Sequence, residues 1–309
     1  MGGTKIAAGV VTPEGEILDE ARYPTPHSRE RLVESIGRAV AEVRGGFDVG
    51  GVCLAVPGLI LDQKNTVVFS PNLRAIEGIP LKEELGSKIG LPLTIENDAN
   101  AAAWGEFRFG AGSEVDHLVF VTLGTGIGGG VITHGVLLRG AQGSGGELGH
   151  VTVHATGPRC ACGNRGCLEA LASGTAIGRR GREVASERPN SALGRLAIKR
   201  KVLGEDVTEL ARGDDELALS VLEEAGQGLG IGLAGFVNIF NPEMVVVGGG
   251  VMEAGELILK PARREVYLRA RPPSRDLVEV KEATLGPESG VLGAAALARD
   301  ASGEYLLGN

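Results

Sequence analysis

The stretch Gly146–Glu169 reads GELGHVTVHATGPRCACGNRGCLE and carries three of the four cysteines of this 309-residue chain. Cys160, Cys162 and Cys167 lie within eight positions, and the first of them follows His150 by ten residues. Three thiolates and one imidazole form a complete tetrahedral ligand set for Zn²⁺, with no vacant position for a reacting water. The spacing therefore predicts a structural zinc site of three cysteines and one histidine.

Two alternatives to a metal site are a disulfide and three unconnected thiols. A Cys-x-Cys disulfide closes a small strained ring, and the chain lacks the even, dispersed cysteines of a secreted scaffold, so both are disfavoured. The fourth ligand stays open at this point, because alternation along an extended segment puts His150 and His154 on the same face. Glu147 and Glu169 are either solvated surface charges or acceptors of hydrogen bonds from ligand hydroxyls.

The pattern G-E-x-G-H followed by C-x-C-G-x-x-G-C-x-E resembles the signature of the ROK sugar kinases, a family of bacterial glucokinases, other hexose kinases and related repressors. The resemblance implies that His150, rather than His154, binds zinc and also faces the sugar. It implies that Glu147 and Glu169 hold sugar hydroxyls. It also implies an α/β, two-domain, actin-like (ribonuclease H-like) ATPase fold with a cleft between the domains.

Composition agrees with a soluble enzyme that has two sizeable cores, since 43% of the residues are hydrophobic and 23% are charged. The net charge of -8 argues against nucleic acid or an anionic membrane as a partner. No signal peptide opens the chain, and every apolar run is broken before membrane-spanning length, so we expect neither secretion nor membrane insertion. Clustered, reduced cysteines favour the cytoplasm.

The chain opens with Met1-Gly-Gly-Thr-Lys5, followed by an apolar run over 6–11 and, after a Thr-Pro-Glu-Gly turn, by residues 16–23. This pattern predicts a β-hairpin. A Gly-Gly-Thr turn can offer N–H groups and a hydroxyl to phosphate, although alone it is more often only a turn. The resemblance assigns three residues here to the nucleotide: Gly3, Thr4 and Lys5.

An amphipathic helix is predicted over 28–44 and a buried strand over 49–56. The later segment Ser70-Pro-Asn-Leu73 is a turn bounded by proline, with no chemistry visible in its residues alone. It matches the PNL segment of the family, and this resemblance makes Asn72 a candidate sugar contact.

Glu96-Asn97-Asp98-Ala-Asn100 separates a strand predicted over 91–95 from an alanine-rich helix. Asn and Asp at this place are typical of a helix N-cap. A carboxylate at the carboxyl end of a strand also lies at the rim where α/β sheets bind ligands. The match to the family motif E-N-D-A-N implies that Asp98 is the general base and Asn97 a sugar contact. The positive helix end is expected to keep Asp98 ionised at pH 7.

A strand over 117–123 leads into Gly124-Thr-Gly-Ile-Gly-Gly-Gly130, with 131–133 as the predicted hairpin partner. The run lacks the Gly-Lys-Ser/Thr of a P-loop, and alone it indicates a flexible turn. It resembles the second phosphate loop of the actin-like ATPases. The resemblance implies that Thr125 and Gly126 contact phosphate and that the other glycines leave room for it.

Residues 170–240 are predicted to be largely helical, and a strand over 244–247 stops at a glycine run. The resemblance assigns Gly248 and Gly249 to the adenosine site. The helical run 290–298 is expected to pack on the first domain. A boundary near 110–115 gives two predicted domains: 1–112 plus 290–309, and 113–289 with the zinc loop and the adenosine site.

The predicted function is ATP-dependent phosphorylation of a hexose, with glucose favoured and Mg²⁺ accompanying ATP. Kinases of N-acetylmannosamine, fructose or mannose are the alternative, and polyphosphate is an open alternative donor. A repressor of the same family is disfavoured because no helix-turn-helix segment precedes the first loop, and an inactive sugar binder is disfavoured by the intact Asp98. We expect a homo-oligomer, either a dimer or a tetramer.

In the actin-like superfamily the first phosphate loop reads Asp-x-Gly-x-Thr and follows a central strand, whereas Met1-Gly-Gly-Thr matches only from the second position. Loss of a central strand would leave a gap flanked by unpaired backbone groups. The expectation is that Met1 is an internal methionine of a longer reading frame.

Overall fold

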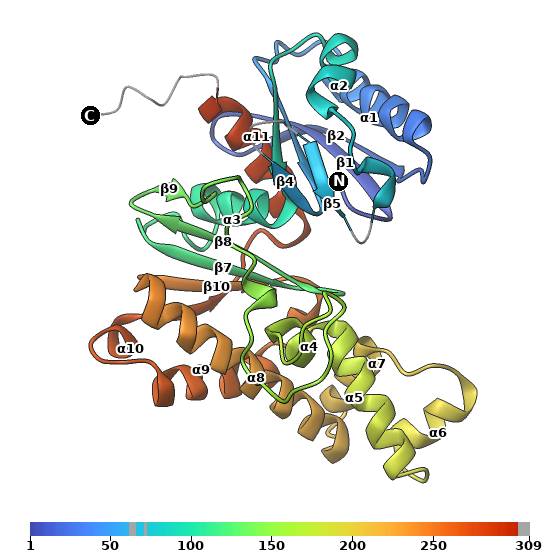
Figure 1. Ribbon diagram of the computed structural model, residues 1–309, viewed down its shortest axis with the longest axis vertical. Coiled ribbons are helices and arrows are strands. Elements are labelled where there is room, and N and C mark those ends of the chain that lie inside the picture. The colour runs from blue at the N-terminus through green and yellow to red at the C-terminus, as the bar shows by residue number, and fades with distance from the viewer. Residues whose placement is uncertain (62–65, 71–72, 302–309) are drawn as a thin grey trace.

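The computed structural model describes residues 1–61, 66–70 and 73–301. Figure 1 shows an α/β molecule whose first strands and helices lie at one end, while a mixed sheet and the longest helices lie at the other. The two parts meet at α3 (Asp98–Phe109) and α11 (Ser289–Ala301). The functional residues predicted from the sequence come from both parts.

The chain begins with the predicted hairpin. Strands β1 (Lys5–Val11) and β2 (Ile17–Pro24) pair antiparallel. The predicted helix over 28–44 is α1 (Arg29–Arg44), which packs on both strands. Its buried residues recur at helical spacing, as the alternation of apolar and charged residues required. They are Leu32, Val33, Ile36, Ala39 and Val43.

Two further strand pairs complete this part. Strand β3 (Val52–Val56) pairs parallel with β6 (Leu93–Asn97), and β4 (Leu59–Leu61) pairs antiparallel with β5 (Thr66–Phe69). Helix α2 (Leu81–Ile89) precedes β6. Because α3 begins directly after β6, its first residues stand at the carboxyl end of a parallel strand, where α/β folds place ligands.

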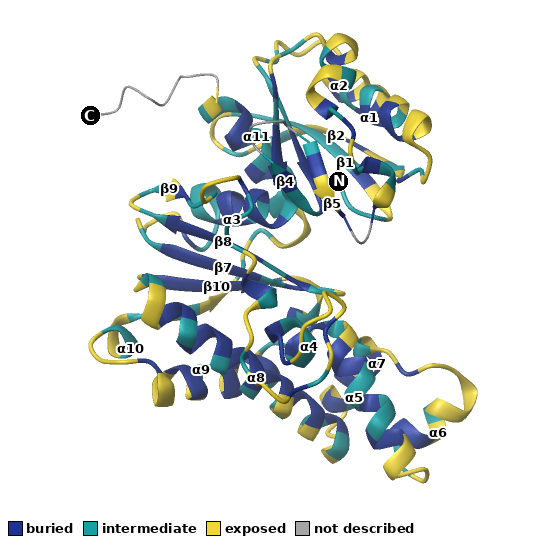
Figure 2. Ribbon diagram, in the orientation of Figure 1, coloured by how far each residue is buried: buried dark blue, intermediate teal, exposed yellow. Residues whose placement is uncertain are grey.

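The mixed sheet has the strand order β11-β10-β7-β8-β9. Strand β10 (Met244–Gly248) is parallel to both β7 (Leu118–Leu123) and β11 (Glu279–Glu282). Strand β8 (Ile127–Thr133) is antiparallel to β7 and to β9 (Val136–Leu137). Figure 2 shows that β7, β8 and β10 are largely buried, so this sheet forms the centre of its part.

The prediction that the glycine run 124–130 forms one long turn after β7 is wrong. The turn occupies 124–126, and β8 already begins at Ile127, so Gly128, Gly129 and Gly130 are strand residues. A Cβ on Gly128 would lie 2.8 Å from the Ala99 Cβ, and one on Gly130 would lie 2.5 Å from the Ala103 Cβ. These two glycines are therefore explained by close packing of α3 on the strand and not by room for phosphate.

Helix α8 (Glu216–Phe240) is continuous despite its glycines. A Cβ on Gly226 or Gly230 would meet α9 (Glu256–Arg269), and one on Gly232 would meet Leu168. The glycines thus let neighbouring helices approach α8 closely. The remaining helices of this part are α4 (Leu168–Ala172), α5 (Gly174–Glu187), α6 (Ala192–Lys199), α7 (Gly204–Arg212) and α10 (Ser274–Leu277). The 3-10 helices among the described residues are η2 (Arg74–Ile76), η3 (Leu148–His150), η4 (Gly250–Ala254) and η5 (Gly286–Glu288).

Helix α11 packs on α3, β1 and β3, as expected for the last helical run. The contact is close, because a Cβ on Gly293 would lie 1.6 Å from the Ala101 carbonyl oxygen. Trp104 of α3 shares a buried cluster with Phe120 of β7 and Leu297 of α11. Since this core crosses the predicted boundary, the division into 1–112 plus 290–309 and 113–289 stays a prediction.

Among the helices described, none combines the length and the apolar character that crossing a lipid bilayer requires.

Candidate functional site

The four predicted zinc ligands lie together. The ligand atoms of His150, Cys160, Cys162 and Cys167 all lie within 4.8 Å of one another, and the three thiols are free. The sequence alone left the histidine open, and the structure places His150 in this group as the last residue of η3. The Nδ1 of His154 instead lies 3.4 Å from the Thr156 hydroxyl.

The spacing of these ligand atoms fits an ion with tetrahedral coordination. The Sγ atoms of Cys162 and Cys167 are 3.7 Å apart, and the Cys160 Sγ is 3.8 Å from the His150 Nδ1. In a tetrahedral zinc site with Zn–S bonds of about 2.3 Å, neighbouring sulfur atoms lie about 3.8 Å apart. The donor set and the spacing could therefore hold a metal ion such as Zn²⁺.

The two ring nitrogens of His150 face different groups. While Nδ1 faces Cys160, Nε2 lies 4.0 Å from the Glu147 Oε2. An imidazole that binds a metal through one nitrogen is held in one orientation and can donate a hydrogen bond from the other. A metal bound by His150 Nδ1 and the cysteines would thus hold the imidazole with its Nε2 toward Glu147.

Glu169 joins the cysteine group to the turn between β7 and β8. Its Oε2 accepts a hydrogen bond from the Ile127 N–H at 3.0 Å, and its Oε1 accepts one from the Cys160 Sγ at 3.4 Å. A Cβ on Gly126 would lie 2.3 Å from the same Oε2. Only glycine at position 126 therefore leaves this carboxylate in place.

Asp98 is the first residue of α3 and half-buried. Its Oδ1 accepts a hydrogen bond from the Ala99 N–H at 3.0 Å. Burial raises the pKa of Asp98 above its ordinary value, against the opposing effects of the Met1 amino group and the Ala99 N–H. The helix end predicted from the sequence is present, but burial outweighs it. A raised pKa suits a general base, because the best catalytic pKa lies near the working pH.

The charges of other predicted site residues affect the pKa of Glu147. Burial raises the pKa of Glu147, and the nearby carboxylates of Asp98 and Glu169 raise it further, while His150 lowers it. Asp98, His150 and Glu169 thus lie near enough to Glu147 for their charges to act on it. Carboxylates can accept hydrogen bonds from the hydroxyls of a polyhydroxyl compound, and one of them can also accept a proton.

Asn97 is the N-cap of α3, as expected for an Asn directly before a helix. Its Oδ1 accepts hydrogen bonds from the N–H groups of Ala99 and Asn100, at 2.9 and 3.1 Å. Its Nδ2 donates to the Gly58 carbonyl oxygen at 3.1 Å, which leaves one amide hydrogen for a ligand. The other predicted amide contact, Asn72, lies outside the described residues.

One ion pair beside this segment was not predicted. The buried Glu96 accepts hydrogen bonds from the Asn97 N–H at 2.9 Å, from the Asn100 Nδ2 at 3.0 Å and from the Arg139 Nε at 2.8 Å. It therefore fixes the backbone immediately before Asp98. Arg139 is remote in sequence and belongs to no motif, so only the fold could reveal the contact.

The first glycine turn is attached to the end of β2. The Thr25 N–H donates to the Thr4 carbonyl oxygen at 3.0 Å, and the Thr25 hydroxyl donates to the Gly2 carbonyl oxygen at 2.7 Å. This contact holds the turn that contains Gly3, Thr4 and Lys5.

A cavity of about 480 Å³ adjoins the second glycine turn. Gly124 and Thr125 line it together with Gly174, the first residue of α5. The Gly174 N–H donates to the Gly124 carbonyl oxygen at 2.8 Å, and Ser173 caps the helix. A Cβ on Gly124 would meet no atom within 4 Å. A helix N-terminus beside a backbone segment with free space around it is suited to bind an anion such as phosphate.

Gly248 is the last residue of β10, and Gly249 connects it to η4. A Cβ on Gly248 would lie 2.9 Å from the Ala283 Cβ, so this residue packs in the core. Gly249 has φ 92° and approaches the Leu123 backbone. The next residues, Gly250 and Val251, line the 480 Å³ cavity. Position 249 needs glycine, since other residues rarely adopt such a φ.

Several residues of this cavity were missed by sequence reasoning. Its wall includes polar side chains from α5 and α7, which carried no recognisable motif. The one available signal was Ser173-Gly-Thr175, a serine that caps a helix beginning with glycine. The missed polar residues are Thr175, Arg182, Lys201, Glu205, Thr208 and Glu253.

Comparison with known proteins gives consistent matches over nearly the whole chain. The sequence model described as ROK family matches residues 1–301. A glucokinase of Thermotoga maritima is 40% identical, over 98% of this chain and 96% of the relative. The xylose repressor of Bacillus subtilis is 34% identical, over 96% of this chain and 75% of its own length. The crystal structure of a ROK family glucokinase from Streptomyces griseus in complex with glucose and AMPPNP has a TM-score of 0.84 and 41% identity, and covers 97% of each chain.

Proposed function

The chain belongs to the ROK family, and we propose that it is a hexose kinase of the glucokinase type, which transfers the γ-phosphoryl group of ATP to glucose. The observation that carries the proposal is the convergence of Asp98 with Glu147, His150 and Glu169. Through Glu169 this group is joined to the glycine turn between β7 and β8. These contacts support a site that combines a base, acceptors for sugar hydroxyls and a turn for phosphate.

The sugar would be held by the three side chains next to the cysteine group. The carboxylates of Glu147 and Glu169 would accept hydrogen bonds from sugar hydroxyls, and the Nε2 of His150 would donate one. Asn97 would supply a further contact, and Asn72 stays a candidate from the resemblance. Two carboxylates fixed by different elements would orient the sugar so that one hydroxyl faces Asp98.

Asp98 would then act as the general base. Its carboxylate takes the proton of the sugar hydroxyl, for which the 6-hydroxyl is the favoured position, as that oxygen forms a bond to the γ-phosphorus and the bond to the β-phosphate oxygen breaks. The products are the sugar phosphate and ADP. The Glu96–Arg139 pair and the Asn97 cap hold the backbone at this residue, which keeps the base in place during transfer.

The nucleotide would lie between the two glycine turns. Gly3, Thr4 and Lys5 would approach its phosphates from the first turn, and Thr125 and Gly126 from the second. The 480 Å³ cavity between α5 and η4, beside Gly248 and Gly249, has room for the adenosine. Mg²⁺ would enter as the Mg-ATP substrate and neutralise phosphate charge.

Zinc would have a structural role here. His150, Cys160, Cys162 and Cys167 would hold it, and a closed set of four protein ligands offers no position for catalysis. Its contribution would be to order the loop that carries Glu147 and Glu169. The predicted cytoplasmic location and the predicted dimer or tetramer remain proposals of the same kind.

The direct test is ADP release by the purified protein with Mg-ATP and a panel of sugars: glucose, mannose, fructose and N-acetylmannosamine. We expect the highest kcat/KM with glucose. Replacing ATP by polyphosphate in the same assay identifies the donor. A preference for another hexose would reassign the substrate. The absence of sugar-dependent ADP release from folded, zinc-replete protein would contradict kinase function and favour a binding role like that of the repressor relatives.

A further inference from the structure

Glu106 of α3 carries a buried carboxylate that no step of the proposed reaction uses. The residue is fully covered, with 0% of its surface exposed. A charged group at such a place is costly unless hydrogen bonds compensate it. Glu96, another buried carboxylate, is paired with Arg139. The hydrogen bonds described for Glu106 come instead from backbone N–H groups and one hydroxyl.

The carboxylate of Glu106 binds two segments at once. Its Oε2 accepts hydrogen bonds from the Ala111 N–H at 3.0 Å, from the Thr284 N–H at 3.2 Å and from the Thr284 hydroxyl at 3.3 Å. Its Oε1 accepts one from the Leu285 N–H at 2.8 Å. A Cβ on Gly110 would lie 2.1 Å from Oε2, so glycine at position 110 leaves room for the carboxylate. One side chain thus holds together two segments that are far apart in the sequence.

These two segments are the places where the described chain passes between the two parts of the fold. Strands β1 to β6 belong to the first part, and β7 to β11 form the mixed sheet of the second. Residues 110–117 lead from α3 to β7, and residues 283–288 lead from β11 to α11 (Figure 1). We call them the first and the second connector. Because a change of the angle between the parts must bend the connectors, a group that holds both of them lies at a hinge.

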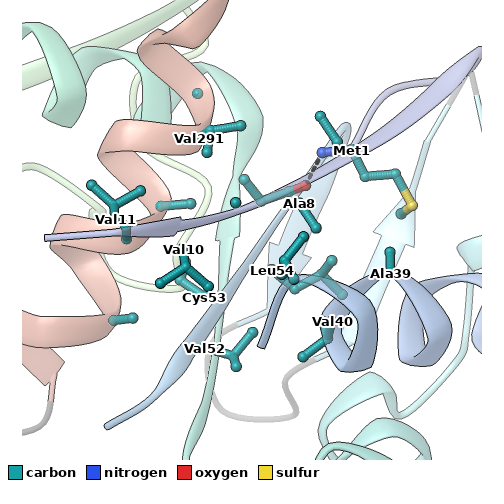
Figure 3. A pocket seen from close by; sticks show the side chains of 18 of the residues that line it. Met1, Ala8, Val10, Val11, Ala39, Val40, Val52, Cys53, Leu54 and Val291 are labelled. Carbon is teal, nitrogen blue, oxygen red and sulfur yellow. Dashed lines mark hydrogen bonds between the residues drawn. The ribbon is translucent and has the colours of Figure 1, made fainter. Parts of the chain in front are cut away.

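Helices α3 and α11 form the contact between the two parts. Helix α3 packs on β7 and β8, while α11 packs on β1 and β3, and Figure 3 shows its Val291 next to β1. The two helices approach each other closely at two glycines. A Cβ on Gly105 would lie 2.3 Å from the Ser289 carbonyl oxygen, and one on Gly293 would lie 1.6 Å from the Ala101 carbonyl oxygen. Glycine has no side chain to interlock, so the helices can turn against each other at these points.

The proposed reaction depends on the angle between these parts. The first glycine turn, Gly3–Lys5, belongs to the first part, and the second, Thr125–Gly126, belongs to the second part. A nucleotide held by both turns would therefore face the sugar correctly at only one angle. Asp98 begins α3, and Glu106 lies about 12 Å further along the same helix. A rotation of about 5° about Glu106 moves a group at this distance by about 1 Å, which is enough to impair transfer.

From these features we propose that Glu106 is a positioning residue of the kinase and anchors the hinge between the two parts. Its carboxylate holds both connectors at one point, so the parts turn about this point and reach one closed arrangement when sugar and nucleotide bind. Glu106 is buried away from both substrates and acts through the connectors and α3. The inference rests on the proposed kinase function, to which it adds the residue that sets the closed angle.

The test is steady-state kinetics of Glu106→Gln with Mg-ATP and glucose. Glutamine keeps the shape of the side chain, but its amide NH₂ replaces one acceptor and faces an N–H donor of a connector. We expect kcat to fall at least about tenfold, while the KM values for glucose and ATP stay within about threefold, because the groups that bind each substrate are unchanged. A residue that only stabilises the fold would lower Tm and leave kcat of the folded protein unchanged.

Glu265→Gln is the matched control. Glu265 is also buried, but it pairs with Arg269 of its own helix, α9, at 2.7 Å. Small-angle X-ray scattering follows closure itself. Glucose with a non-hydrolysable ATP analogue should reduce the radius of gyration of the unaltered chain and of Glu265→Gln, and should reduce that of Glu106→Gln less. Where Glu106→Gln does not fold, Thr284→Val decides, since it removes only the hydroxyl bond to Glu106 and should lower kcat about twofold or more.

Several results would overturn the positioning role alone, with the unaltered chain active as a kinase. They are near-normal kcat in folded Glu106→Gln, an equal loss of kcat in Glu265→Gln, and equal contraction of all three proteins. Unchanged kcat in folded Thr284→Val has the same meaning where Glu106→Gln does not fold. If the unaltered chain itself shows no sugar-dependent ADP release, the kinase function fails and the positioning role fails with it.

Discussion

At the scale of single residues, the sequence located Asp98 correctly at the junction of a strand and a helix. The motifs also predicted that Asn97, Glu147 and Glu169 belong to the same site. The environment of Asp98 could not be predicted, because its burial depends on tertiary packing, which leaves no local signal in the sequence. The expected ionisation of Asp98 at pH 7 stays a prediction.

The raised pKa of Asp98 predicts a particular pH dependence. A general base works only when it is deprotonated, so raising its pKa moves the loss of activity to higher pH. We expect the acidic limb of the kcat/KM profile for glucose to have its midpoint above the ordinary aspartate value of 3.8. The profile should be measured between about pH 3 and 8, with circular dichroism to show that the protein stays folded. A midpoint at or below 3.8 would count against burial of the base.

At the scale of elements, most helices and strands follow from apolar periodicity, as α1 and the β1–β2 hairpin show. The wrong prediction of a turn at 128–130, which are strand residues of β8, has a specific cause. Glycine in a sequence indicates a turn, but glycine also appears where another backbone approaches a strand closely. Which of the two holds at β8 depends on α3, and the contact of these elements is not visible in the sequence.

Packing of α3 on β8 leads to a prediction for a pair of glycines. Gly130→Ala should destabilise the fold by about 1–3 kcal/mol, since its Cβ would lie 2.5 Å from Ala103, and should lower kcat by displacing α3 and Asp98. Gly124→Ala meets no atom within 4 Å and should keep its stability while raising the KM for ATP. Urea unfolding and steady-state kinetics of both variants provide the check. Equal stability of the two would show that α3 does not depend on the glycine strand.

The cysteine loop gives a second prediction at this scale. Cys162 is exposed, so Cys162→Ser should fold but lose most of its zinc. Because the loop also carries Glu147 and Glu169, the KM for glucose should rise much more than the KM for ATP. Metal analysis and both KM values are the measurements, and Cys53→Ser serves as a cysteine control outside the metal group. Stoichiometric zinc in Cys162→Ser, or an equal rise of both KM values, would contradict the assigned role of the loop.

At the scale of the whole molecule, the α/β fold of the actin-like type was predictable because the motifs belong to a family that the comparisons confirm. What the sequence could not supply was the set of contacts that join its parts. The shared core of α3, α11 and β7, the Glu96–Arg139 pair and the polar wall of the 480 Å³ cavity all bring together residues far apart in the chain. Contacts of this kind depend on tertiary packing, which leaves no local periodic signal.

The central claim is that Asp98 is the base of a glucose kinase, and comparison of Asp98→Asn with Asp215→Asn tests it most directly. Asp215 caps α8 through the Ala218 N–H at 3.0 Å, so the control makes the same chemical change at a helix end that has no catalytic role. We expect Asp98→Asn to form glucose 6-phosphate at least about a hundredfold more slowly while still binding glucose, and Asp215→Asn to behave like the unaltered protein. Near-normal turnover by Asp98→Asn would reduce Asp98 to a structural residue and contradict the proposed mechanism.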